Sequence, residues 1–239
     1  MIMGQSIVEI FKGSFVMLLL LAASIAALAL IIERFWYFTR NKFNQAKGLA
    51  EIRRQLKENG PTQALAWAKA QKNPLGRLFS TALENLTMSG DELADLLYSQ
   101  ILDERIRYER LLGGMGTLAN VATLLGLLGT VTGLIEAFHN IAVTGSGGPA
   151  VVSAGIAEAL ITTAFGLLIG IPTLFFYNYY SKKAADTAMT LESTSDRLLV
   201  MLNRYKRMTQ AAGQQTTTQA PPPQPKPKPA PAPETGWEF

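Results

Sequence analysis

The chain has 239 residues, of which only 17% are charged, and it carries a formal net charge of +4 and no cysteine. The absence of cysteine excludes disulfides, thiolate metal ligands and thiol nucleophiles. No nucleotide-binding loop or zinc motif occurs, so we expect neither an enzyme nor a bound cofactor. Acidic residues are interleaved with the basic ones, so no basic stripe that would bind nucleic acid is predicted.

Three long uncharged runs dominate the chain, at residues 13–32, 111–135 and 159–181. Each has about 20 residues or more, which is the length that a helix needs to cross a bilayer. Three such runs in one small chain predict an all-α integral membrane protein. The predicted transmembrane helices are 14–38, 111–138 and 151–180.

The distribution of basic residues predicts the orientation of these helices. The first span is expected to be an anchor, because no small-residue cleavage site closes it. Of the 22 Lys and Arg, thirteen lie within 34–110 and eight follow the third span. The positive-inside rule therefore predicts a multi-pass protein of the bacterial inner membrane with 34–110 and the C-terminus in the cytoplasm. The N-terminal lead-in 1–13 and the link 139–150 are then periplasmic.

The cytoplasmic region 39–110 is predicted to be helical. Gly60-Pro61 and Asn73-Pro74 each mark a helix start, since proline is tolerated in a first helical turn. Ser89 and Glu92 have the spacing of a capping box. No helix breaker follows, so we expect the helix that starts there to run unbroken into the second span.

After the third span, the chain is predicted to continue as a charged cytoplasmic helix, 181–208. Residues 209–239 form a proline-rich tail, in which eight of the twelve prolines of the chain fall between Pro221 and Pro233. Such a segment cannot bury a core, so disorder is predicted. A solvated tail and a docking segment that ends in 236–239 are both compatible with this composition.

Glu158 is the carboxylate that the sequence singles out within the third span. An acidic side chain in an apolar helix is costly and usually faces a bundle interior or a water-filled cavity. Thr162 lies four residues on and shares its face, and Gly166 and Gly170 extend that face with small residues. Glu158 is therefore the predicted ion-binding residue.

The second span carries a thinly polar stripe that could face Glu158. Asn120, Thr123 and Thr130 recur at helical spacing, and Gly126, Gly129 and Gly133 flank them. Hydroxyls that face a carboxylate would give a hydrated or ion-coordinating path, although single threonines often bond only their own backbone. The small residues of both spans also predict tight packing in a homo-oligomer. Two further residues, Glu136 and His139, are interpreted as interfacial or solvated.

The segments 118–133 (LANVATLLGLLGTVTG) and 155–170 (GIAEALITTAFGLLIG), with Pro172, resemble the MotA/TolQ/ExbB proton-channel family, and its three-span ExbB/TolQ-type members in particular. The resemblance implies a pentamer around a single-span ExbD/TolR-like subunit with a membrane aspartate, acting on a TonB/TolA-like effector. It matches Glu158, Thr130 and Thr163 to the pore residues of the family.

Two positions depart from the family pattern. Thr123 stands where the family often has proline, and Thr162 stands where it often has alanine. Helical geometry favours Thr162 as the partner of Glu158, whereas the family match favours Thr163, so both are kept. The additional hydroxyls leave both H⁺ and Na⁺ open as the transported ion.

Three hypotheses about function follow from these features. The first is a subunit of an inner-membrane motor that couples an ion gradient to mechanical work in outer-membrane transport or envelope maintenance. The second is a self-contained ion channel or transporter. The third is a structural membrane scaffold. A single membrane carboxylate in each chain favours the motor, because a partner aspartate would complete the ion path.

Overall fold

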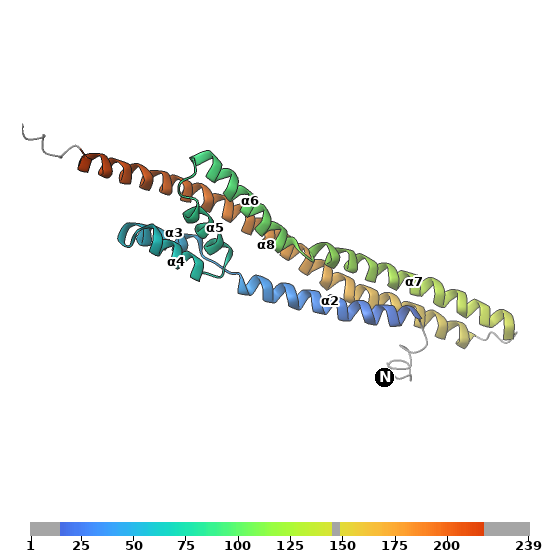
Figure 1. Ribbon diagram of the computed structural model, residues 1–239. Coiled ribbons are helices and arrows are strands. Elements are labelled where there is room, and N and C mark those ends of the chain that lie inside the picture. The colour runs from blue at the N-terminus through green and yellow to red at the C-terminus, as the bar shows by residue number, and fades with distance from the viewer. Residues whose placement is uncertain (1–14, 145–148, 218–239) are drawn as a thin grey trace, which may run out of the picture. The chain divides into compact units, whose positions relative to one another are not determined.

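The computed structural model describes residues 15–144 and 149–217, and every element in these ranges is a helix (Figure 1). The chain divides into two units, residues 1–199 and 200–239, and the described part of the second unit is the end of the last helix. The lead-in 1–13 and the tail from residue 218 lie outside the described residues. The helices are α2 (Phe15–Arg40), α3 (Gln45–Glu58), α4 (Gly60–Ala70), α5 (Pro74–Glu84), α6 (Gly90–Glu109), α7 (Leu112–Thr144) and α8 (Pro149–Thr217).

Three helical stretches in the described ranges are long and apolar enough to cross a membrane, which confirms the three-span, all-α prediction. They lie in α2, in α7 and in the first half of α8. Their outward faces expose large apolar side chains, as expected of surfaces that meet lipid or another membrane helix. Examples are Leu18, Leu21, Ile25, Leu124, Leu128, Leu168 and Ile171.

The three spans pack together at two apolar clusters. Val16, Met17 and Leu20 of α2 are buried against Leu125 of α7 and Phe165 of α8. A second cluster, which we call the aromatic junction, lies at the other end of the spans. Burial of both clusters holds α2, α7 and α8 in one bundle. The aromatic junction consists of Phe38, Tyr108, Leu112, Met115, Tyr180 and Ala184.

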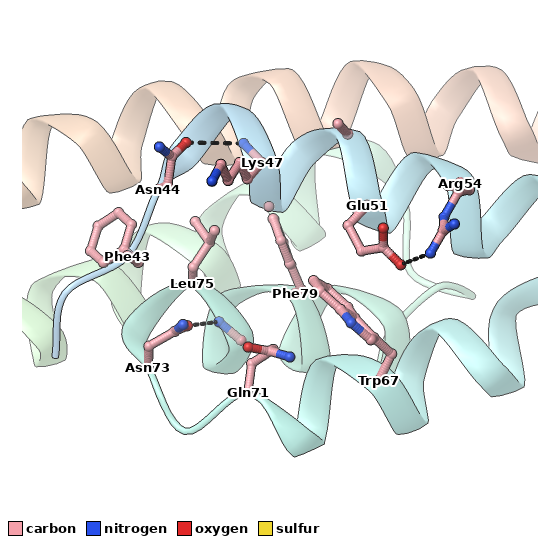
Figure 2. A pocket seen from close by; sticks show the side chains of 13 residues that line it. Phe43, Asn44, Lys47, Glu51, Arg54, Trp67, Gln71, Asn73, Leu75 and Phe79 are labelled. Carbon is pink, nitrogen blue, oxygen red and sulfur yellow. Dashed lines mark hydrogen bonds and ion pairs between the residues drawn. The ribbon is translucent and has the colours of Figure 1, made fainter. Parts of the chain in front are cut away.

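We call the helices α3–α6 the polar lobe. α4, α5 and α6 begin where the sequence predicts, whereas the start of α3 at Gln45 was not predicted. The side-chain oxygen of Asn44 accepts a hydrogen bond from the Lys47 amide (3.0 Å), and that of Asn73 accepts one from the Gly76 amide (2.8 Å) (Figure 2). Ser89 and Glu92 form the predicted capping box. These bonds satisfy amides that a helix N-terminus leaves without an intrahelical partner.

The polar lobe has a hollow of about 620 Å³ among α3, α4 and α5. Figure 2 shows the side chains that line it. Trp67 and Phe79 form part of its wall, and its one carboxylate, Glu51, is bonded to Arg54 at 2.7 Å. That ion pair lowers the pKa of Glu51 from its ordinary value, chiefly through the hydrogen bond from Arg54. The hollow is larger than the cleft described below, but it contains no membrane carboxylate.

The prediction that the capping-box helix runs unbroken into the second span is wrong. α6 ends at Glu109 and α7 begins at Leu112. Between them Leu111 has φ of 66°, in the left-handed region that residues with a side chain seldom adopt. The span that follows is therefore a separate helix.

A distant arginine provides the physical reason for this break. In a continuous helix the carbonyls of Arg107 and Tyr108 would accept the amides of residues 111 and 112. Arg34 of α2 donates to these two carbonyls instead, at 3.5 Å and 3.2 Å, and is itself only 2% exposed. A cation at a helix C-terminus also interacts favourably with the helix dipole. The signal for the break therefore lies 70 or more residues away in the sequence, which is why the local pattern does not reveal it.

Two other helix ends differ from the sequence-based boundaries. α7 continues through the first half of the predicted periplasmic link, to Thr144, and α8 begins at Pro149. α8 also passes the predicted end near Met208 and reaches Thr217. The third span and its polar extension are thus one helix, as predicted, although it is longer at both ends.

We expect Glu104→Gln to destabilise the polar lobe by about 2–3 kcal/mol, below the range for a fully buried ion pair because Arg77 is 32% exposed. Glu104 is 1% exposed and accepts two hydrogen bonds from Arg77, at 2.5 Å and 2.7 Å. These bonds raise the pKa of the Arg77 guanidinium. Thermal denaturation of the purified protein measures the loss.

Glu109→Gln is the matched control for this prediction. Glu109 lies on the same helix, pairs with Arg105 in an exposed i,i+4 bridge and should give no measurable change. Equal stability of the Glu104 and Glu109 variants would show that the buried pair does not stabilise the lobe.

Candidate ion-pathway site

The site is built on the close antiparallel packing of α7 against α8. A Cβ placed on Gly126 would lie 3.1 Å from the Gly166 Cα, and one placed on Gly133 would lie 2.9 Å from the Ala159 Cβ. Only small residues allow two backbones to approach this closely. The contacts follow one antiparallel register along both helices: Gly126 meets Gly166, Gly129 meets Thr162, Gly133 meets Ala159 and Gly155 meets Ala137.

This register shows where the predicted small-residue faces are used. Gly170 completes the series, because a Cβ there would lie 2.9 Å from the Ala119 carbonyl oxygen. The structure thus places Gly126, Gly129, Gly133 and Gly166, together with Gly170, at the contact between two helices of one chain. The sequence predicts instead that these small residues pack between subunits. Because they are used within one chain, they no longer support the prediction of a homo-oligomer.

Toward the 144–149 end, the two helices leave an open cleft of about 460 Å³ between them. Its polar side chains come from both helices: Thr132, Glu136 and Asn140 from α7, and Glu158 and Thr162 from α8. The rest of its wall consists of Gly129, Gly133, Ala137, Ala154, Gly155 and Ala159. Because small residues line it, the carboxylates remain accessible to water or an ion.

Two carboxylates therefore share the cleft. Glu158 and Glu136 are both exposed, and among the described residues neither forms a hydrogen bond or an ion pair. Two acidic groups in one water-accessible cleft of a membrane helix pair can bind a cation or pass a proton between them. The sequence predicts an interfacial Glu136 and only one membrane carboxylate per chain. With two carboxylates in the cleft, the need for a partner aspartate to complete the ion path no longer separates the motor from a self-contained channel.

The segment that contains this helix pair is similar to known proteins. The model of the MotA/TolQ/ExbB proton channel family matches residues 70–193, which is more than half of the chain and includes the cleft. The chain belongs to the MotA/TolQ/ExbB proton channel family. It is 34% identical over 175 residues to the ExbB-like 3 biopolymer transport protein of Synechocystis, covering 70% of this chain and 81% of that protein.

Two further proteins extend the comparison. The biopolymer transport protein ExbB of Neisseria meningitidis is 27% identical over 209 residues, covering 81% of this chain and 92% of that protein. The structure of C. jejuni MotAB has a TM-score of 0.57 at 18% identity, covering 84% of this chain and 80% of that chain. This structural likeness shows a shared fold.

The two threonines that the sequence could not separate have different surroundings. Thr162 lines the cleft with Glu158 and is 2% exposed; its hydroxyl donates to the Ala159 carbonyl at 2.7 Å. Thr163 does not line the cleft. Its hydroxyl donates across to the Gly126 carbonyl of α7 at 2.8 Å, so it joins the two spans at their closest approach.

The polar stripe predicted on the second span lies beside the cleft rather than in it. The Thr123 hydroxyl donates to the Ala119 carbonyl at 3.2 Å and lies against Gly170, and the Thr130 hydroxyl donates to the Leu127 carbonyl at 2.6 Å. Asn120 is exposed. Within this one chain, none of the three side chains meets Glu158 in the cleft.

The cleft does have a sequence signal. Thr132, Glu136 and Asn140 recur every four residues on α7, and positions four apart share one face of a helix. This face is next to the stripe that the sequence analysis chose. The choice between the two faces requires the register of α7 against α8, which a single helix does not encode.

Proposed function

We propose that this chain is the channel-forming subunit of a membrane motor, in which protons that pass the Glu136–Glu158 cleft drive mechanical work on a partner. The observation that carries the proposal is the pair of unpaired carboxylates in one open cleft, within a chain of a proton-channel family. Glu158 binds and releases the ion, and Glu136 relays it to or from the adjoining membrane surface.

The proposal includes an assembly. Family membership supports a homo-oligomer, with five subunits as the expected number, around a single-span ExbD/TolR-like subunit that carries a membrane aspartate. The broad apolar surfaces exposed on α2, α7 and α8 leave room for both kinds of contact. A TonB/TolA-like effector would receive the work. In this assembly, Thr130 and Thr163 border the route from Glu158 to the partner aspartate.

Reconstitution tests the motor against a self-contained channel. The purified chain is placed in liposomes with a potassium gradient, alone or with a single-span ExbD/TolR-like protein, and proton entry is followed with a pH-sensitive dye after valinomycin addition. We expect flux only with the partner. Flux from the chain alone would favour a self-contained channel, and no flux in either case would favour a scaffold.

The same liposomes, with either a proton gradient or a sodium gradient, test which ion is transported. Hydroxyl-bearing side chains such as Thr132 and Thr162 beside two carboxylates offer oxygen ligands of the kind that Na⁺ also uses. We expect flux to follow the proton gradient without sodium on either side. A requirement for sodium would assign the cleft to Na⁺ instead.

We expect a periplasmic N-terminus and a cytoplasmic C-terminus, because 21 of the 22 Lys and Arg lie in segments that the positive-inside rule assigns to the cytoplasm. Single cysteines at Ser6 and Ser146 should react with a membrane-impermeant maleimide in spheroplasts, and one at Thr217 should not. The native chain has no cysteine, so it provides the blank. If only the Thr217→Cys variant were labelled, the protein would have the opposite orientation.

A further inference from the structure

A second polar pocket lies at the other end of the spans, where α2 meets the break between α6 and α7. It has a volume of about 500 Å³. Its wall is unusual for its content of arginine, which comes from four separate places in the chain: Arg34 in α2, Arg77 in α5, Arg107 in α6 and Arg110 at the break. Glu33, Tyr37, Asn41 and Leu111 complete it.

Among the residues that the structure describes, acidic side chains do not balance the positive charge of this pocket. Arg77 is committed to Glu104, and Arg34 donates to Glu33 and to the carbonyls that end α6. Glu33 and Glu104 thus offset two of the four arginines, and two positive charges remain in excess.

Two of the arginines, at the rim of the pocket, have guanidinium N–H groups available to bind a ligand. Arg107 is 55% exposed and reaches Glu104 only at 3.5 Å. Arg110 is exposed, and its guanidinium has no partner among the described residues. Guanidinium groups bind phosphate oxygens through two parallel hydrogen bonds, so a rim of this kind suits a phosphate group.

The pocket lies at the level where the apolar spans end. Glu33 and Arg34 follow the uncharged run of α2, and Leu111 begins that of the second span. Phe35 and Trp36, beside Arg34, are 63% and 64% exposed, as aromatic residues at a membrane surface are. Leu111 in the pocket wall is 41% exposed and offers an apolar contact next to the arginines.

We propose that this pocket, with Arg107 and Arg110 at its rim, binds a phosphate group, supplied by the headgroup of an anionic phospholipid or by a soluble phosphate. The headgroup is favoured over an acidic protein segment because the pocket combines excess positive charge with exposed apolar side chains at membrane depth. A bound anion there would shield Arg107 from Arg110 and hold α2 against the break.

The test titrates each ligand into the full-length oligomer in uncharged detergent. Binding is followed by the rise in the thermal denaturation midpoint. The ligands are dihexanoyl-phosphatidylglycerol, dihexanoyl-phosphatidylcholine, sodium phosphate and a hexaglutamate peptide. We expect stabilisation by phosphatidylglycerol, with little from phosphatidylcholine. Each basic side chain strengthens binding to an anionic surface about five-fold, so Arg107→Gln with Arg110→Gln should weaken it roughly 30-fold.

Two single variants separate a loss of binding from a loss of folding. Arg110→Gln alone removes no contact recorded in the structure and should weaken binding about five-fold. Arg105→Gln, on the same helix but outside the pocket, is the control and should leave binding unchanged. Stabilisation by phosphatidylglycerol but not by equal sodium phosphate assigns the site to lipid, whereas stabilisation by both assigns it to phosphate itself.

Three results would overturn the proposal. The first is equal affinity of the wild type and the Arg110→Gln variant for both phosphate ligands. The second is equal affinity of the wild type for phosphatidylcholine and phosphatidylglycerol, because the excess charge would then have no role. The third is stabilisation by hexaglutamate alone, which would identify the pocket as a site for an acidic protein segment.

Discussion

Glu158→Gln is expected to lower partner-dependent proton flux by roughly 100-fold or more, the scale of a lost proton-transfer group. Glutamine keeps the size and hydrogen-bonding capacity of glutamate but cannot release a proton at this position. Glu158 is exposed in the cleft and forms no hydrogen bond or ion pair among the described residues, so the variant should insert and assemble normally. Flux in liposomes and size-exclusion chromatography measure the two properties on the same sample.

Glu136→Gln is the matched comparison, since it makes the same change in the same cleft. As a relay, Glu136 can be replaced in part by water, so its loss should slow flux only several-fold. If Glu136→Gln abolished flux and Glu158→Gln remained active, Glu136 would be the ion-binding residue and Glu158 the relay. Full activity of both variants would remove the main support for an ion path and favour the scaffold.

Gly166→Ala is expected to destabilise the packing of α7 against α8 by about 1–3 kcal/mol beyond its matched control. A Cβ at Gly166 would lie 2.7 Å from the Ala122 carbonyl oxygen and 2.8 Å from the Gly126 Cα. Both are backbone atoms, so no side chain can rotate away and α7 must separate from α8. Because the cleft depends on this contact, proton flux should fall with stability.

Gly114→Ala is the control for this prediction. Gly114 also lies in a membrane helix, α7, but nothing lies within 4 Å of a Cβ placed there. Alanine improves helix propensity at both positions by about 1 kcal/mol, so the difference between the variants isolates the helix contact. The difference is read from thermal denaturation midpoints in one detergent, and similar midpoints would mean that the close approach does not hold the helices together.

The fold follows largely from local patterns in the sequence. An uncharged run of membrane length has few alternatives to a spanning helix, because a lipid-exposed backbone must satisfy its own hydrogen bonds. The starts of α4, α5 and α6 were equally predictable, since Asn73 and Ser89 cap amides that lie only a few residues away. Glu158 stood out for a similar reason, as a charge in an otherwise apolar run.

The remaining features required the tertiary structure, because each depends on residues far apart in the chain. The break at Leu111 is supported by Arg34, which lies on another helix. The inclusion of Glu136 in the cleft, and the choice of Thr162 over Thr163 beside Glu158, depend on the register of α7 against α8. A sequence specifies which residues share a face of one helix, but the partner of that face is decided only when two backbones pack together.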